Sequence, residues 1–188
     1  MPARQRADAR RNYARILAVA EEEVATRGAD ASLEQIARTA GVGSATVRRH
    51  FPTRRALLEA VSQTQIEALC ARARDLAAGD GDSRTALLDW LGDVVAYSAS
   101  IRGLAAALAH DGAGPDSLHE NSCTAALEEA GNPLLHRAIG DGAVQADVTF
   151  AELITLVVGI ALATESHPDP AAQADRLFRL AVAGLSPG

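Results

Sequence analysis

The hydrophobic positions of the first third of the chain follow the period of an α-helix. Residues 11–27 form an amphipathic segment that ends before Gly28, and its apolar face consists of Ile16, Leu17, Ala20 and Val24. A second helix begins after Ser32, which forms a capping-box pattern with Gln35, and this helix ends at Gly41. The spacing therefore predicts two helices joined by a short loop.

Further helices follow along the rest of the chain. Ser44 can cap a short helix that ends at Phe51, and Thr53 can cap a long one that runs to about Ala77. The later pattern predicts helices over 84–99, 101–110, 117–130, 133–140 (with Asn132 as cap and Pro133 first), 147–164 and a last one ending near 183. The predicted fold class is all-α, with about nine helices; counted separately, the ranges above number ten.

The segment from Ser32 to Phe51 has the residue pattern of a helix-turn-helix. Gly41 stands in the turn, where a positive φ is usual, and the residues suited to burial are Ala37, Val42, Val47 and Phe51. The side chains left facing outward are Ser44, Thr46, Arg48, Arg49 and His50. This is the layout of a helix whose outer face enters the major groove of DNA. A plain helical hairpin has the same pattern and is the alternative interpretation.

Charge is distributed unevenly along the chain, whose net charge is −6. Residues 1–60 hold 11 Arg and 7 acidic residues, a net charge of +4, whereas residues 61–188 hold 7 Arg and 17 acidic residues, a net charge of −10. This predicts that only the N-terminal part meets a polyanion such as DNA. Residues 1–10 are expected to be a flexible basic arm, which either follows DNA into a minor groove or has no role in binding.

Cysteine usage and hydropathy predict a cytoplasmic protein without a membrane partner. Cys70 and Cys123 are far apart and outside any CxxC pattern, which is typical of a reducing compartment. The Arg-rich N-terminus lacks the apolar segment of a signal peptide. The most apolar stretch, residues 150–164, contains Glu152 and is too short to span a bilayer.

The residues from Ala14 to Val61 resemble the N-terminal domain of the TetR family of bacterial transcriptional regulators. They read ARILAVAEEEVATRGADASLEQIARTAGVGSATVRRHFPTRRALLEAV and match the family without a gap, including its terminal Phe-Pro and Leu-Leu pairs. The resemblance implies a three-helix DNA-binding domain with a helix-turn-helix over residues 11–56. It also implies a helical ligand-binding and dimerisation domain over residues 57–188.

The resemblance implies roles for individual residues. Family members contact phosphates or bases at the positions of Ser32, Ser44, Thr46, Arg49 and His50. Arg54 stands where the family usually has a Lys that reaches a phosphate, and Arg keeps that charge. Arg48 departs from the family, which usually has Tyr there; it is expected to contact either a phosphate or the edge of a guanine. A solvated helix face is the other interpretation of Arg48 and Arg49.

The last two predicted helices each carry a broad apolar face. One face consists of Leu153, Leu156, Val157, Ile160 and Ala161 beside Gly159, and the other of Leu177, Phe178, Leu180, Ala181 and Leu185. Both faces suit the core of a monomer, but the resemblance implies a homodimer through these helices. A dimer places two recognition helices about 34 Å apart on double-stranded DNA and reads a palindromic operator. The resemblance further implies a repressor that a small-molecule effector releases.

Polar and aromatic residues in the middle of the chain are candidates for the effector pocket: Trp90, Tyr97, Ser98, His110, Asn121 and Cys123. Each also fits the role of an ordinary core or surface residue. A lining of mostly Ala, Leu and Val would suit an apolar or amphipathic ligand.

A metal- or redox-responsive regulator is the alternative function. His119 and Cys123 lie four residues apart on one predicted helix face, which is a suitable ligand spacing, and His110 is a further candidate ligand. No complete set of ligands is evident, so neither a metal nor another cofactor is predicted. The sequence contains no GxSxG, HExxH, phosphate loop or dinucleotide fingerprint, and it is therefore not predicted to be an enzyme.

Overall fold

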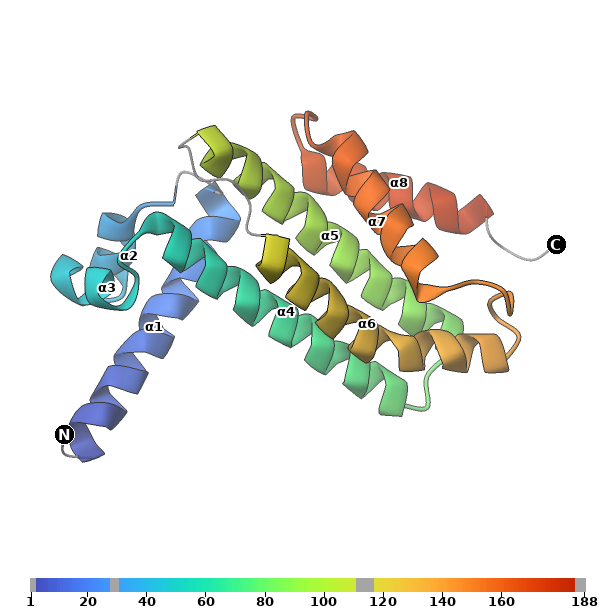
Figure 1. The fold of residues 1–188 in the computed structure, drawn as a ribbon, viewed down its shortest axis with the longest axis horizontal. Coiled ribbons are helices and arrows are strands. Elements are labelled where there is room, and N and C mark those ends of the chain that lie inside the picture. The colour runs from blue at the N-terminus through green and yellow to red at the C-terminus, as the bar shows by residue number, and fades with distance from the viewer. Residues whose placement is uncertain (1–2, 28–30, 111–116, 185–188) are drawn as a thin grey trace. The chain divides into compact units, whose positions relative to one another are not determined.

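The structure is a computed structural model that describes residues 3–27, 31–110 and 117–184, with side chains for residues 8–27, 31–100 and 123–183. These ranges contain eight α-helices and no strand (Figure 1): α1 (Ala3–Arg27), α2 (Leu33–Thr39), α3 (Ser44–His50), α4 (Arg54–Ala78), α5 (Ser83–His110), α6 (Ser117–Gly140), α7 (Phe150–Thr164) and α8 (Pro170–Gly184). The prediction of an all-α fold is confirmed. No helix in these ranges could cross a membrane, because none is both long and apolar enough.

Two interruptions that the sequence predicts in the middle of the chain do not occur. Residues 84–99 and 101–110 belong to one helix, α5, and residues 117–130 and 133–140 belong to another, α6. Pro133 lies inside α6 and does not begin a helix. Leu127 and Ala130 before it and Leu134 and Ala138 after it are all buried, so the apolar face of α6 continues past the proline. That burial outweighs the roughly 3 kcal/mol that an internal proline costs.

Two helix starts also differ from the prediction. Helix α1 begins at Ala3 instead of Arg11, so most of the segment expected to be a flexible arm is helical. Arg11 pairs with Asp8 one turn earlier, and such a pair favours the helix. Helix α7 begins at Phe150 instead of Asp147, because Thr149 and Glu152 form a reciprocal capping box. The hydrogen bond from the Thr149 backbone N–H also lowers the pKa of Glu152.

The chain divides into two compact units, residues 1–64 and 65–188. The division lies within α4, whereas the sequence placed the domain boundary after Ala56. In the N-terminal unit α2 contacts both α1 and α3. Its core consists of Ile16, Ala20, Ile36, Ala37, Ala40, Val47, Phe51, Leu57 and Val61. The apolar stripe predicted on the first helix therefore packs against the helix-turn-helix.

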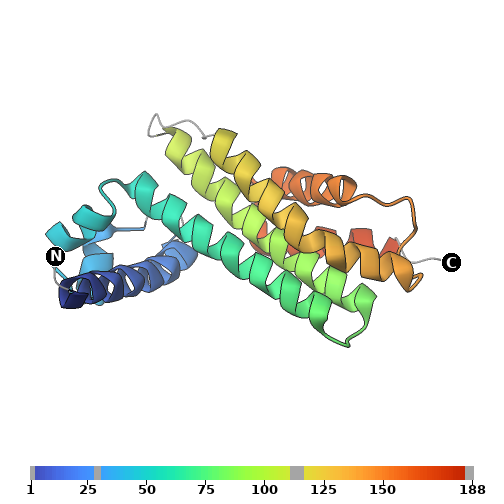
Figure 2. The ribbon, with the colours of Figure 1, turned by 60° about the horizontal axis from the view of Figure 1, so that its bottom comes forward.

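In the C-terminal unit α5 is the central helix. It contacts α6, α7 and α8, and α7 and α8 also contact each other. Figure 2 shows α5 and α6 side by side from a second direction. Part of the apolar faces predicted for the last two helices lies in this core: Val157, Ile160, Ala161 and Phe178 are buried. For these residues the alternative interpretation, the core of the chain itself, is correct.

Trp90 joins four helices of this unit. Its side chain on α5 is fully buried, and its Nε1 donates a hydrogen bond of 2.9 Å to the Leu69 carbonyl of α4. The indole also packs against Phe150 of α7, with ring centroids 6.1 Å apart. Gly131 of α6 completes the contact, because a Cβ there would lie 2.4 Å from Phe150 and 2.5 Å from Trp90. Only glycine leaves room for both rings.

Arg137 of α6 caps the C-terminal end of α4. Its guanidinium donates hydrogen bonds to the carbonyls of Leu76, Ala77, Gly79 and Gly81, over distances of 2.6 to 3.1 Å. The last carbonyls of a helix have no partner within the helix and attract positive charge. Arg137 therefore satisfies the end of α4 from a neighbouring helix.

The close approach at Gly131 predicts an asymmetry between two glycine substitutions in this unit. Gly131→Ala should destabilise the protein by about 1–3 kcal/mol, because the added methyl overpacks the Trp90 and Phe150 rings. Gly92→Ala is the matched control: its Cβ would lie 3.8 Å from Phe178, an ordinary contact, and alanine favours helix. Urea unfolding followed by circular dichroism measures both. Equal stability of the two variants would contradict the packing argument.

Candidate nucleic-acid interface

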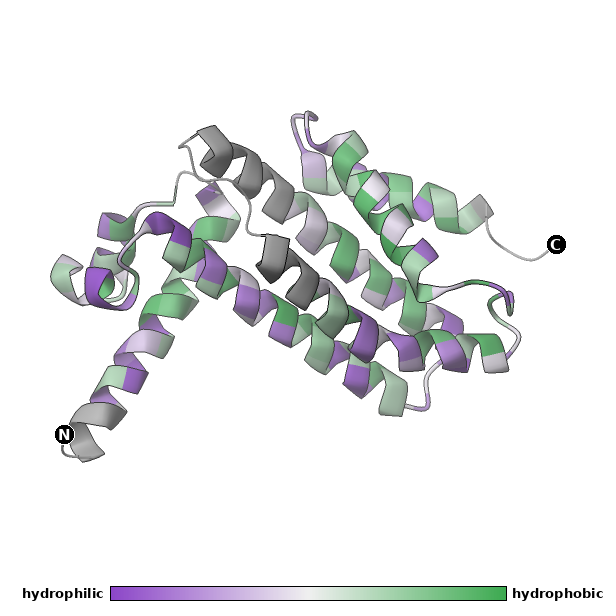
Figure 3. Ribbon diagram, viewed as in Figure 1, coloured by the Kyte–Doolittle hydropathy of each residue, from purple (hydrophilic) through white to green (hydrophobic). Residues whose placement is uncertain are grey.

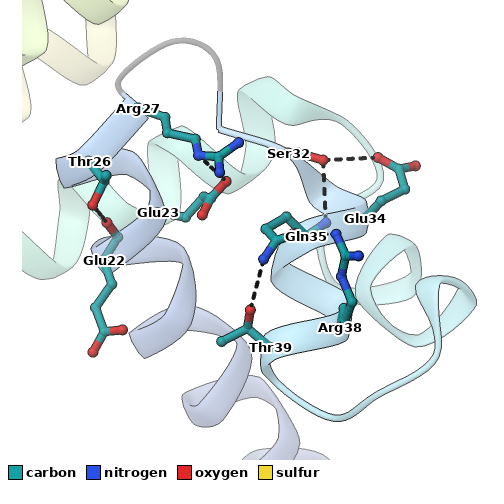
Figure 4. A network of polar contacts seen from close by, with 9 residues as sticks. All are labelled: Glu22, Glu23, Thr26, Arg27, Ser32, Glu34, Gln35, Arg38 and Thr39. Carbon is teal, nitrogen blue, oxygen red and sulfur yellow. Dashed lines mark hydrogen bonds and ion pairs between the residues drawn. The ribbon is translucent and has the colours of Figure 1, made fainter.

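Helix α2 begins at a side-chain cap, as the sequence predicts. Ser32 Oγ accepts a hydrogen bond of 3.3 Å from the backbone N–H of Gln35 (Figure 4). The Gln35 side chain does not complete the predicted capping box, because its Nε2 faces Thr39 Oγ1 at 3.5 Å. Figure 4 shows Ser32 and Glu34 at the beginning of this helix and Thr39 at its other end. Ile36 and Ala37 of the same helix are buried.

The turn between α2 and α3 depends on Gly41. Its φ is +63°, in the left-handed region that favours glycine, so the conformation predicted for this position is confirmed. The Val42 backbone N–H donates 3.0 Å to the Ala37 carbonyl and closes the turn. The cap of α3 is Gly43, and Ser44 is the first residue of the helix instead of its cap. The Ser44 side chain is exposed.

Burial on one side of α3 leaves its charged residues on the other. Val47 and Phe51 are almost wholly buried in the core of the N-terminal unit, as predicted. Arg48 and Arg49 are exposed, together with Ser44, while Thr46 is half-buried. A helix of seven residues can present only one such face, and this one displays two guanidinium groups and a hydroxyl. That set of donors matches the acceptors of phosphates and base edges.

His50 is less available than the sequence analysis expected. Its ring lies edge-on to Tyr13 of α1, with centroids 5.7 Å apart, and Tyr13 also packs against Phe51 at 5.3 Å. His50 is half-buried as a result. Sequence reasoning missed Tyr13, although it lies one turn before Ile16 on the predicted helix. This aromatic group ties the end of α3 to α1.

Arg54 stands at the start of α4, next to a confirmed cap. Thr53 Oγ1 accepts a hydrogen bond of 3.0 Å from the backbone N–H of Ala56. Arg54 is half-buried, and its Nε and Nη2 atoms are covered without a hydrogen-bond partner among the described residues. A buried donor without a partner carries a desolvation cost. Turning this guanidinium outward to a phosphate or to water would remove that cost.

Arg48 forms an ion pair that sequence reasoning did not identify. Its Nη2 donates a hydrogen bond of 2.9 Å to Glu34 Oε1 on α2. Glu34 has a lowered pKa, because of a hydrogen bond with its own backbone N–H and then because of the Arg48 guanidinium. The partners are 14 residues apart, so no helical spacing signals the pair. Glu34 is the functional candidate that the sequence analysis missed.

The residues predicted to line an effector pocket show little sign of a binding role. Trp90 is fully buried and its single donor is bonded to Leu69, so it has no polar atom left for a ligand. Tyr97, Ser98 and Cys123 are half-buried. The side chains of His110 and Asn121 lie outside the described residues.

The structure does not support the metal- or redox-responsive alternative. Among the residues with described side chains, no group of three or more His, Cys, Asp or Glu could hold a metal ion. Cys123 is half-buried, and the His110 and His119 side chains lie outside the described residues. Burial raises the pKa of Cys70, which disfavours the reactive thiolate.

Comparison with known families accounts for both parts of the chain. Residues 16–61 match the model of the tetR family of bacterial regulatory proteins, and residues 82–187 match the model described as the C-terminal domain of SbtR-like transcriptional regulators. Together these matches cover the helix-turn-helix and most of the C-terminal unit. The chain belongs to the TetR family.

Solved structures agree with this assignment of the TetR-family protein. A TetR transcriptional regulator from Streptomyces coelicolor is 34% identical, with a TM-score of 0.73, and the match covers 93% of this chain and 98% of that one. The TetR transcription regulatory protein from Mycobacterium vanbaalenii is also 34% identical, with a TM-score of 0.71 and coverages of 97% and 99%.

A more distant structure shares the fold alone. FadR from Bacillus subtilis, solved in complex with stearoyl-CoA, is 16% identical, with a TM-score of 0.53, over 92% of this chain and 98% of that one. A search of curated proteins finds no match. The TetR family is thus established by the two family models and the two structures at 34% identity.

The exposed face of α3 predicts the effect of removing one guanidinium from this TetR-family regulator. Arg49→Ala should weaken binding to an operator about 5- to 100-fold, corresponding to roughly 1–3 kcal/mol. Fluorescence anisotropy at several salt concentrations measures the loss, and a phosphate contact also lowers the slope of log affinity against log salt by about 0.9. Arg74→Ala, at an exposed position of α4 in the C-terminal unit, is the matched control. Equal affinity of the two variants would remove Arg49 from the interface.

Proposed function

We propose that the chain is a homodimeric TetR-family repressor that binds a palindromic operator through α3 and leaves it when a small molecule binds the C-terminal unit. The observation that carries the DNA-binding part is the exposed row of Ser44, Arg48 and Arg49 opposite the buried Val47 and Phe51. Ser32, Thr46, His50 and Arg54 border this row in the sequence and complete the proposed contact surface.

The charge distribution supports DNA binding by the N-terminal part of the chain. The first 60 residues carry a net charge of +4 and the rest of the chain −10, so attraction to a polyanion is confined to the end that holds α3. Arg54 is a further proposed phosphate contact at the start of α4: its Nε and Nη2 lack partners among the described residues, and its side chain would have to turn outward to reach the DNA backbone. These donors would gain the hydrogen bonds that they lack.

The proposed dimer uses the faces of α7 and α8 that the core of the chain leaves uncovered. Leu162 on α7 is 51% exposed and Leu180 on α8 is 60% exposed, and they are two of the three large hydrophobic residues exposed among the described side chains. Helix α7 is hydrophobic along most of its length (Figure 3). Gly159 lies on the exposed side of α7, where a Cβ would meet nothing within 4 Å. A second copy of the chain would cover this surface.

A single substitution tests the dimer and the operator symmetry together. Selection of bound DNA from a random pool should return a palindrome for the wild type, with half-sites about one helical turn apart. Gly159→Arg should be monomeric by sedimentation and should lose the paired half-sites, because its charged side chain would stand in the interface. The control is Ala125→Arg, an exposed position of α6, which should remain dimeric. A dimeric Gly159→Arg variant would exclude this face.

The effector is proposed to be apolar or amphipathic. The described interior of the C-terminal unit consists mainly of Ala, Leu and Val side chains, which suit such a ligand. FadR, which shares the fold, was solved with stearoyl-CoA. A compound of this kind must favour the released form about 10⁴-fold to turn a mostly bound population into a mostly free one.

Gel shifts with the selected operator test this control. Fatty acids and their acyl-CoA esters, added in a panel with polar metabolites, should include a compound that frees the operator at micromolar to millimolar concentration. In the absence of DNA, Arg49→Ala and the wild type should bind the effector with the same affinity, because the proposed effector site lies in the C-terminal unit and Arg49 lies in the N-terminal unit. Full operator retention across the panel would argue against release by an apolar ligand.

A further inference from the structure

Arg48 is bonded to a side chain of the preceding helix. The Arg48 guanidinium donates from Nη2 to Glu34 Oε1 over 2.9 Å, and the two side chains are 63% and 64% exposed. The other carboxylate oxygen, Oε2, accepts from Ser32 Oγ at 3.4 Å. Both carboxylate oxygens therefore have partners, and the ion pair links α2 to α3.

Stability alone is a weak reason for this pair. An ion pair between two side chains this exposed contributes little to the folded state, because water and salt screen the attraction. A carboxylate beside a DNA-binding face also repels phosphates. The Glu34 carboxylate thus weakens the attraction between this face and DNA phosphates. A role in orienting Arg48 would offset that loss.

The pair leaves the Arg48 guanidinium able to bind further. A guanidinium has five N–H donors in a rigid fork, and Glu34 takes one of them. A long arginine side chain without such a partner samples many rotamers, and ordering it on binding costs conformational entropy. The ion pair shifts the Arg48 rotamers toward the orientation in which Nη2 faces Glu34, before DNA arrives.

We propose that Glu34 is a positioning residue that orients Arg48 to read a guanine in the major groove through two hydrogen bonds. The inference rests on the proposed function, in which the outer face of α3 binds DNA. Guanine is the base whose O6 and N7 acceptors match two adjacent guanidinium donors. A contact of Arg48 with a phosphate would carry no sequence preference, so the base preference of the protein distinguishes the two contacts.

The test compares base preference with overall affinity for the full-length chain. Operators are selected for the wild type, and affinities are then measured for the consensus, for single-base variants and for unrelated DNA. Glu34→Gln should reduce the preference for guanine at one position of each half-site about tenfold. Affinity for unrelated DNA should stay equal or rise, because one negative charge is lost. Glu22→Gln, which removes the same charge from an exposed position of α1, is the control and should keep the guanine preference.

Variants of Arg48 show whether Glu34 acts through it. Arg48→Lys keeps the positive charge but lacks the fork, and it should lose the same guanine preference as Glu34→Gln. In an Arg48→Ala background, Glu34→Gln should have no further effect on base preference, because the ion pair is already absent there. Circular dichroism checks that each variant retains the helix content of the wild type.

Two results would overturn the positioning role. Uniformly stronger binding of Glu34→Gln with unchanged base preferences would mean that Glu34 only repels DNA. An equal loss of preference in the presence and absence of Arg48 would mean that Glu34 acts on its own. A wild type that selects no sequence at all would instead overturn the proposed function, so the two failures are distinguishable.

Discussion

The proposed DNA interface depends on the anchoring of one very short helix. Helix α3 has seven residues, and an isolated helix of that length is unstable in water. It persists because Val47 and Phe51 are buried against α1, α2 and α4 residues of the N-terminal unit. The same two side chains fix the rotation of α3 about its axis, since only one orientation buries both. The direction of Arg48 and Arg49 is a consequence of that burial.

The features predicted correctly from the sequence are those with local causes. The positive φ of Gly41, the cap at Ser32 and the burial of Val47 each follow from a residue type and its immediate neighbours. The continuity of α6 could not be predicted in this way. Pro133 is a local signal for a helix start, and only burial of residues on both sides of it, against other helices, decides otherwise.

Side-chain partners that lie far apart in the sequence form the other class of misses. The Arg48–Glu34 pair spans 14 residues and two helices, so its existence depends on how α2 and α3 cross. Trp90 shows a related ambiguity. From the sequence, a rare aromatic residue in an Ala- and Leu-rich chain fits both a core contact and a ligand contact. The hydrogen bond to Leu69 and the room that Gly131 leaves for the indole ring show that Trp90 is a core residue.

The position of Trp90 gives the protein a built-in optical reporter. It is the only tryptophan of the chain, and it is shielded from water and bonded to the Leu69 carbonyl between α4, α5, α6 and α7. Its emission therefore arises from the C-terminal unit alone and is blue-shifted while these helices remain packed. Any rearrangement that admits water to the indole shifts the emission to longer wavelength. Conformational changes in this unit can thus be followed without a label and without interference from the N-terminal unit.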